Sequence, residues 1–172
     1  VLNQGINILK ASNISNPHLD SEILLSESIN RDKKHIILNS KEILNSEQIN
    51  NFNNFIERRK NGEPIAYIIN KKEFWKDEFY VNKGVLIPRP DTELIIEQVL
   101  KIYSKQSQLQ VLDIGTGSGC ILLSIIKERP NCYGVGIDIS KKSIKVSKIN
   151  AKQLSLTNRV KFIHSSVDNF NI

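Results

Sequence analysis

The sequence predicts an α/β protein in which a helical N-terminal unit precedes an open parallel sheet. Over residues 1–62, apolar residues recur at three- and four-residue steps between helix-capping signals. Over residues 65–81, β-branched and aromatic residues dominate instead. From residue 110 onward, short apolar runs alternate with helical stretches, and one run leads into three glycines at alternate positions. Buried strands that alternate with helices are typical of α/β sheets that bind a ligand at one edge.

Helix signals are clear in the N-terminal unit. Pro17 fits the first position of a helix, because its missing N–H would have no partner there. Asp32 can cap a short helix, and Ser46 can cap a longer one that Gly62 stops. The apolar residues of these helices are expected to form a core.

The pattern then predicts a hairpin and three regions. Ile65 to Ile69 and Lys72 to Val81 read as β-rich stretches about an Asn-Lys turn. We therefore expect a helical domain over residues 1–62, a β-hairpin linker over residues 63–87, and the first part of a second domain over residues 88–172.

A rigid loop follows the hairpin, with prolines at positions 88 and 90. The prolines exclude a helix before Pro90, after which Asp91 or Thr92 can cap a helix toward Tyr103. The loop can position side chains at a site, or it can be a plain helix entrance, and the residues alone favour neither.

The strongest chemical signal is Val-Leu-Asp-Ile-Gly-Thr-Gly-Ser-Gly, residues 111–119. The apolar residues suit a strand buried on both faces, and the glycines allow a tight turn and close approach of a ligand. In the dinucleotide fingerprint the third glycine comes later, at the position of Cys120 here. Asp113 would repel a diphosphate and attract a cation. Together these features disfavour NAD.

The next apolar run, Tyr133 to Asp138, ends in a carboxylate about 20 residues beyond the glycines. A carboxylate in that position can accept hydrogen bonds from both ribose hydroxyls of a nucleotide. Asp138 could instead cap the following helix, as could Ser140. Because the glycine loop and the acid occur together, we favour Asp138 as the ribose anchor.

Composition excludes several classes of protein. A hydrophobic share of 40% and a charged share of 24% describe a globular chain. We see no membrane-length apolar run and no secretory signal, so we expect a cytoplasmic protein without a membrane partner. Cys120 and Cys132 lack partners at metal-ligand spacing and are expected to be buried. The net charge of +6 is spread along the chain, which leaves RNA or an acidic protein open as a partner.

An acid followed by Gly-x-Gly-x-Gly resembles the first motif of the class I methyltransferases, whose cofactor is S-adenosylmethionine. Taken together, the motifs closely resemble the HemK/PrmC family, which methylates the side-chain amide of a glutamine in peptide chain release factors. The segments that carry the resemblance are Gly62-Glu63-Pro64-Ile65-Ala66-Tyr67, Glu73-Phe74-Trp75, Leu86 to Glu93, and Asp113 to Gly119. The resemblance implies a helical domain that docks the release factor, a hairpin linker and a Rossmann-like methyltransferase domain.

The resemblance also implies a cofactor site beside the loop at Pro88 to Glu93. Its expected S-adenosylmethionine contacts are Asp113, Gly115, Thr116, Gly117, Ser118, Gly119 and Asp138. An acid and a tryptophan of the family align with Ser166 and Val167 here. Val167 could still flank the adenine, and a plain loop residue is an equal alternative.

The family's Asn-Pro-Pro-Tyr motif, which holds the substrate glutamine, does not occur in this sequence. We therefore expect no catalytic residue here and a catalytically silent fragment of a longer enzyme. His18, His35 and His164 are isolated in the sequence and suggest no nucleophile–base set. Two alternatives stay open: a methyltransferase for RNA or DNA amino groups, and a non-catalytic module that binds cofactor or protein.

Overall fold

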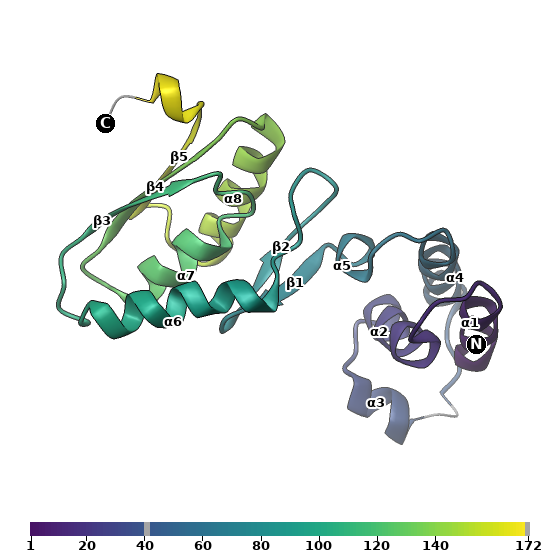
Figure 1. Cartoon of the computed structure of the whole chain (residues 1–172). Helices are drawn as coiled ribbons and strands as arrows, with labels where there is room; N and C mark the ends of the chain where they lie inside the picture. Colours follow the sequence, from purple (N-terminus) through teal and green to yellow (C-terminus); the bar gives the residue numbers. More distant parts are fainter. Residues whose placement is uncertain (40–41, 171–172) are drawn as a thin grey trace. The chain divides into compact units, whose positions relative to one another are not determined.

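The computed structural model describes residues 1–39 and 42–170. The chain divides into two compact units, Val1–Ile69 and Asn70–Ile172 (Figure 1). None of the described helices is long and apolar enough to cross a membrane. In the same residues, no group of three or more His, Cys, Asp or Glu side chains could hold a metal ion.

The first unit is helical. The helices are α1 (Leu2–Ala11), α2 (Pro17–Ile29), α3 (Lys33–Leu38), α4 (Ser46–Lys60) and α5 (Ile65–Ile68). Its core contains Leu9, Leu24, Phe52 and Ile56, which are buried. A Cβ added at Gly5 of α1 would lie 2.6 Å from the Phe52 ring of α4, so these two helices approach closely at that glycine.

Two of the three expected helix starts are confirmed, and one is displaced. Pro17 occupies the first turn of α2, and Asp32 accepts a hydrogen bond from the His35 N–H at 2.8 Å. The prediction that Ser46 caps α4 was wrong, because Asn45 is the cap. Asn45 and Gln48 exchange side-chain-to-backbone hydrogen bonds at 2.9 and 3.0 Å, which is a capping box.

The predicted β structure at Ile65 to Ile69 was also wrong, because these residues form α5 and its C-cap. Arg58 donates hydrogen bonds to the carbonyls of Tyr67 and Ile68 at the end of this short helix. Ile68 is buried in the core of the unit. These tertiary contacts override the local preference of β-branched residues for strands.

The second unit begins with a hairpin and continues as an α/β layer. Its elements are β1 (Lys71–Phe74), β2 (Asp77–Tyr80), the 3₁₀ turn η1 (Pro90–Thr92), α6 (Glu93–Ile102), β3 (Gln110–Ile114), α7 (Cys120–Glu128), β4 (Tyr133–Asp138), α8 (Lys141–Gln153), β5 (Val160–His164) and η2 (Val167–Asn169). β1 and β2 pair antiparallel. The other strands form a parallel sheet in the order β3-β4-β5 (Figure 1). The predicted α/β architecture is therefore confirmed.

The hairpin is fixed at its turn, where Trp75 has a positive φ of 57°. The Trp75 backbone N–H donates to Glu93 Oε1 at 2.8 Å, and its indole N–H donates to Glu128 Oε1 at 3.0 Å. Helix α6 begins after a 3₁₀ turn, and Thr92 makes no side-chain cap there. Thr92 is thus the N-cap residue of α6, one of the two positions expected, but its side chain makes no capping hydrogen bond.

One face of the parallel sheet is covered by helices. A Cβ at Gly134 would lie 2.6 Å from Leu122 of α7, and Phe162 of β5 is buried in the same core. On the other face, Leu112 and Ile114 of β3 are 40% and 57% exposed. The prediction that this strand is buried on both faces was wrong, since Leu112 and Ile114 remain exposed.

Candidate cofactor site

The parallel register brings the glycine loop and Asp138 to one edge of the sheet. Ile114 at the end of β3 lies beside Ile137 of β4, so the residues that follow each strand meet. Gly115 and Thr116 both donate their backbone N–H groups to the Ile137 carbonyl, at 2.9 and 3.0 Å. Gly117 donates to Asp138 Oδ2 at 3.0 Å. This edge is where open α/β sheets bind ligands.

The loop needs its glycines for two different reasons. Gly115, Gly117 and Gly119 have φ values of 78°, 55° and 81°, which L side chains rarely adopt. No atom lies within 4 Å of the place where a Cβ on Gly115 would be, so the backbone there faces open space. A Cβ on Gly119 would instead lie 3.1 to 3.2 Å from side-chain atoms of three residues, Leu123, Ser147 and Phe162. Gly115 therefore leaves room for a ligand, and Gly119 allows close packing.

Asp113 is a partly buried carboxylate next to the loop. Burial raises its pKa, a hydrogen bond from Thr116 at 2.8 Å and a backbone N–H from Leu122 lower it, and the nearby charge of Asp138 raises it. The net shift is upward. A cation that approached this pair of carboxylates would relieve their repulsion, so the site favours a cationic ligand over a diphosphate.

Asp138 is oriented by two backbone groups. Its Oδ1 accepts a hydrogen bond from the Ser140 N–H at 2.8 Å, and its Oδ2 accepts from Gly117. The cap of α8 is Ser140, whose hydroxyl accepts from the Ser143 N–H at 3.2 Å. Of the two roles considered for Asp138, the helix cap thus belongs to Ser140. Each carboxylate oxygen can accept a further hydrogen bond, as ribose binding would require. Ribose binding by Asp138 stays a prediction.

The segment after β5 reaches the same edge. Ser165 donates its backbone N–H to the Asp138 carbonyl at 3.1 Å. Val167 is 55% exposed at the start of η2. The Ser166 hydroxyl is buried and has no hydrogen-bond partner among the described residues. The adenine contact of Val167 stays a prediction.

Other candidate residues serve other contacts. Glu93, at the end of the proline loop, accepts its hydrogen bond from the Trp75 backbone. His164 forms a hydrogen bond with the Ile139 carbonyl at 3.0 Å. The sequence suggested that His35 is isolated. In the structure it is paired, because its Nε2 lies 2.6 Å from Glu42 Oε2. Cys120 and Cys132 are buried as predicted, and burial raises the pKa of Cys120 to about 11.

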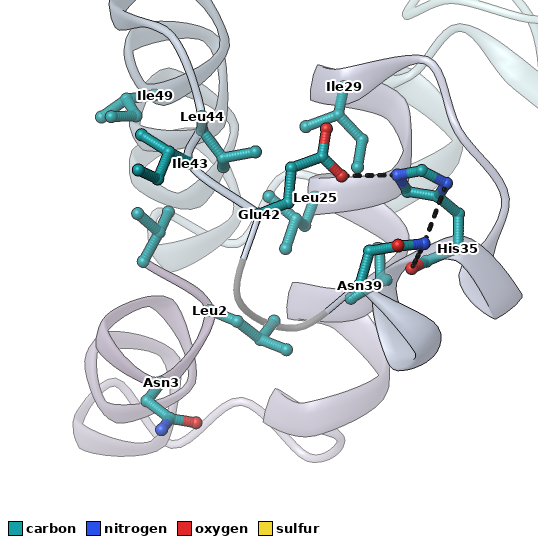
Figure 2. Close-up of a pocket in the computed structure, with 12 residues that line it drawn as sticks. Leu2, Asn3, Leu25, Ile29, His35, Asn39, Glu42, Ile43, Leu44 and Ile49 are labelled. Atoms are coloured by element: carbon teal, nitrogen blue, oxygen red, sulfur yellow. Dashed lines mark hydrogen bonds and ion pairs between the residues drawn. The ribbon is translucent and has the colours of Figure 1, made fainter.

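A cavity of about 460 Å³ lies within the first unit (Figure 2). The His35–Glu42 pair and Asn39 form its polar wall, and Asn39 donates to the His35 carbonyl at 3.1 Å. The apolar lining includes Leu2, Leu25, Ile29, Ile36, Leu44 and Ile49. None of the predicted cofactor contacts lines this cavity.

Residue Asn150 was missed by the sequence reasoning. It lies in α8 and donates a hydrogen bond to the Ser118 carbonyl in the glycine loop at 2.8 Å. The available signal was weak: an Asn on the apolar side of an amphipathic helix, where a polar residue needs a partner.

Both parts of the chain match known families. Residues 1–69 match the PrmC N-terminal domain, and residues 105–171 match a methyltransferase domain. The release factor glutamine methyltransferase of Caulobacter vibrioides is 39% identical, over 91% of this chain and 54% of the relative. The enzyme of the same name from Buchnera aphidicola subsp. Baizongia pistaciae is 44% identical, over 88% of this chain and 54% of the relative.

A longer protein matches as well. The bifunctional methyltransferase of Rickettsia bellii is 39% identical, over 96% of this chain and 34% of the relative. The chain spans about half the length of the release factor glutamine methyltransferases that it matches. The chain is thus similar to a PrmC N-terminal domain followed by a methyltransferase domain, and to release factor glutamine methyltransferases along most of its own length.

Proposed function

We propose that a protein carrying this chain transfers a methyl group from S-adenosylmethionine to the side-chain amide of a glutamine in a peptide chain release factor. The observation that carries the proposal is the pair of carboxylates, Asp113 and Asp138, beside a glycine loop with open space at Gly115. The relatives named release factor glutamine methyltransferase support the choice of substrate.

The described residues fit this cofactor better than a dinucleotide. S-adenosylmethionine carries an ammonium and a sulfonium but no phosphate, which suits a site with two acids. When bound, the cofactor supplies an activated methyl group and its leaving group. Asp113 would attract its positive charge, Asp138 would accept the ribose hydroxyls, and Val167 would flank the adenine.

The chain's own contribution is binding and orientation. Gly117 and Ser140 hold the Asp138 carboxylate in one place, so the ribose hydroxyls would meet an acceptor that is already oriented. Thr116 does the same for Asp113. A preorganised site of this kind fixes where the cofactor lies relative to an incoming amide.

We further propose that the helical N-terminal domain docks the release factor. The first unit has its own core and contains none of the residues proposed to hold the cofactor. In a full-length protein that carries this chain, deleting residues 1–69 should weaken release-factor methylation and leave cofactor affinity nearly unchanged. Equal loss of both would assign the unit to stability instead.

The deciding experiment measures methyl transfer by that full-length protein from radiolabelled S-adenosylmethionine to purified release factor, RNA and DNA. Label should enter the release factor, and replacing its substrate glutamine by Glu should abolish incorporation. Asp138→Ala should impair methyl transfer. Its matched control is Asp168→Ala, at an exposed position of η2, which should leave transfer nearly unchanged. Transfer to RNA or DNA alone would overturn the proposal in favour of a nucleic-acid methyltransferase.

A further inference from the structure

Asn150 is a polar residue placed at one of the most enclosed positions of α8. Its side chain is 1% exposed. Neighbouring buried positions of the helix hold residues such as Ile144, Val146 and Ala151. Asparagine is a weaker helix former than alanine, and a buried amide without hydrogen-bond partners would destabilise the fold. Its presence therefore calls for specific hydrogen bonds.

The Asn150 amide makes three of them. Its Oδ1 accepts from the Tyr80 backbone N–H at 2.7 Å, and its Nδ2 donates to the Tyr80 carbonyl at 3.0 Å. Nδ2 also donates to the Ser118 carbonyl at 2.8 Å. The first two bonds let the side chain pair with the end of β2 as a neighbouring peptide group would. The third reaches the glycine loop.

The third hydrogen bond, to the Ser118 carbonyl, helps to hold the peptide between Ser118 and Gly119 in one orientation. The carbonyl of Ser118 and the N–H of Gly119 belong to the same planar peptide. The carbonyl is held by Asn150, and the N–H donates to the Thr116 carbonyl at 2.7 Å. Rotating this peptide would break both hydrogen bonds and leave a buried carbonyl without a partner. Its orientation sets the path of the chain between Gly117 and α7.

We propose that Asn150 is a positioning residue for the cofactor site, fixing the Ser118–Gly119 peptide and linking the glycine loop to β2. It acts through the loop and contacts no ligand itself. The same amide group holds Tyr80, so a displacement of β2 would act on the side chain that orients the loop. The part of the inference that concerns the cofactor rests on the proposed function.

The test compares Asn150→Asp with Gln153→Ala in the purified chain. Asp keeps the shape of the side chain and an acceptor for the Tyr80 N–H, but it removes both amide donors. Gln153 lies one turn later in α8, and its Nε2 donates to the Glu78 carbonyl of β2 at 3.3 Å. The control therefore perturbs the contact between α8 and the hairpin without touching the bond to Ser118.

Two readouts separate positioning from general stability. Without cofactor, amide hydrogen exchange over residues 115–119 should be roughly tenfold faster in Asn150→Asp and unchanged in Gln153→Ala. With cofactor product, the Kd for S-adenosylhomocysteine, measured by calorimetry on folded protein, should rise roughly tenfold in Asn150→Asp only. Exchange in α7, away from the loop, should stay at the level of the unchanged chain.

Exchange over residues 115–119 that is unchanged, or that rises equally throughout the second unit, would overturn the inference. If the unchanged chain binds no S-adenosylhomocysteine, the proposed function loses its support, and the exchange readout still decides the role of Asn150. Should Asn150→Asp fail to fold, Asn150→Ala removes the same donors without adding a charge, and the same comparison applies.

Discussion

The carboxylate of Asp138 accepts a hydrogen bond from the backbone N–H of Gly117, 3.0 Å away and 21 residues earlier in the chain. Its other oxygen accepts from Ser140 at the start of α8. One side chain thus links the glycine loop to the entrance of the next helix. Because both oxygens are held by backbone groups, a ligand that used this carboxylate would lose little entropy in orienting it.

Replacing Asp138 by Ala should weaken binding of S-adenosylhomocysteine by about 1.5 to 3 kcal/mol, the usual value of hydrogen bonds to a charged group. NAD should bind poorly to both proteins, because Asp113 repels a diphosphate. Calorimetry on folded protein checks both expectations, with Asp168→Ala as the exposed control. Tight NAD binding, or an Asp138→Ala variant with unchanged affinity, would contradict the assignment of this site.

Asp113 should make stability depend on pH. Its folded pKa is raised, chiefly by burial, so the folded state binds a proton more tightly than the unfolded state does. Its contribution to stability is therefore full below the ordinary pKa of an Asp and is lost as pH rises through the folded pKa. Above that pH, the ionised group leaves the free chain less stable than a neutral isostere would.

The variant Asp113→Asn cannot ionise, so it avoids this loss of stability at high pH, and it keeps an acceptor for the Thr116 hydroxyl. Urea unfolding should show the variant to be more stable than the unchanged chain at neutral pH, and the difference should close in acid. Binding of S-adenosylhomocysteine should weaken in parallel, because the carboxylate that attracts the ammonium is gone. A difference in stability that persists unchanged into acid would show that ionisation of Asp113 is not its cause.

The capping box of α4 gives a sharp test of the cap, which the sequence analysis placed one residue too late, at Ser46. Asn45→Ala should destabilise the first unit by about 1 kcal/mol, because it leaves the Gln48 N–H without its acceptor. Ser46→Ala is the matched control, since Ser46 lies inside the helix, and it should change stability by less than about 0.5 kcal/mol. Thermal unfolding of both variants distinguishes them. A larger loss from Ser46→Ala would restore Ser46 as the cap.

The hairpin turn depends on Glu93. Glu93→Ala should destabilise the second unit by about 1 to 3 kcal/mol, because the Trp75 N–H loses a charged acceptor at a turn with positive φ. Glu97→Ala, an exposed change one turn later in α6, should have little effect. Urea unfolding followed by the fluorescence of the chain's one tryptophan reports on this turn directly. Equal midpoints for the two variants would contradict a structural role for Glu93.

From the sequence, the strands of the sheet could be predicted better than the tertiary contacts around them. The strand Tyr133–Asp138 has the bounds of the predicted apolar run, because that run ends in Asp138 and is followed by the capping residue Ser140. Helix α5 was missed because Arg58 and the core, which lie outside its own sequence, decide its conformation. Asn150 was missed for a related reason: its partners Tyr80 and Ser118 are 70 and 32 residues away in the chain.

The exposed apolar residues on one face of β3 lead to a prediction about self-association. Leu112 is 40% exposed on this face, and in the described sheet β3 pairs with a neighbour, β4, on one side only. An apolar strand with a free edge is a template for pairing with another chain. The purified 172-residue chain should therefore form dimers or larger assemblies as its concentration rises.

Leu112→Lys should shift this equilibrium toward monomer, because a charge on the exposed face opposes burial between two copies. Ile102→Lys is the control, since Ile102 is exposed at the end of α6 and lies outside the sheet. Sedimentation velocity over a range of concentrations measures the weight-average mass of each protein. A chain that stays monomeric at all concentrations would contradict the prediction, and equal dissociation by both variants would show that net charge, not the β3 face, controls association.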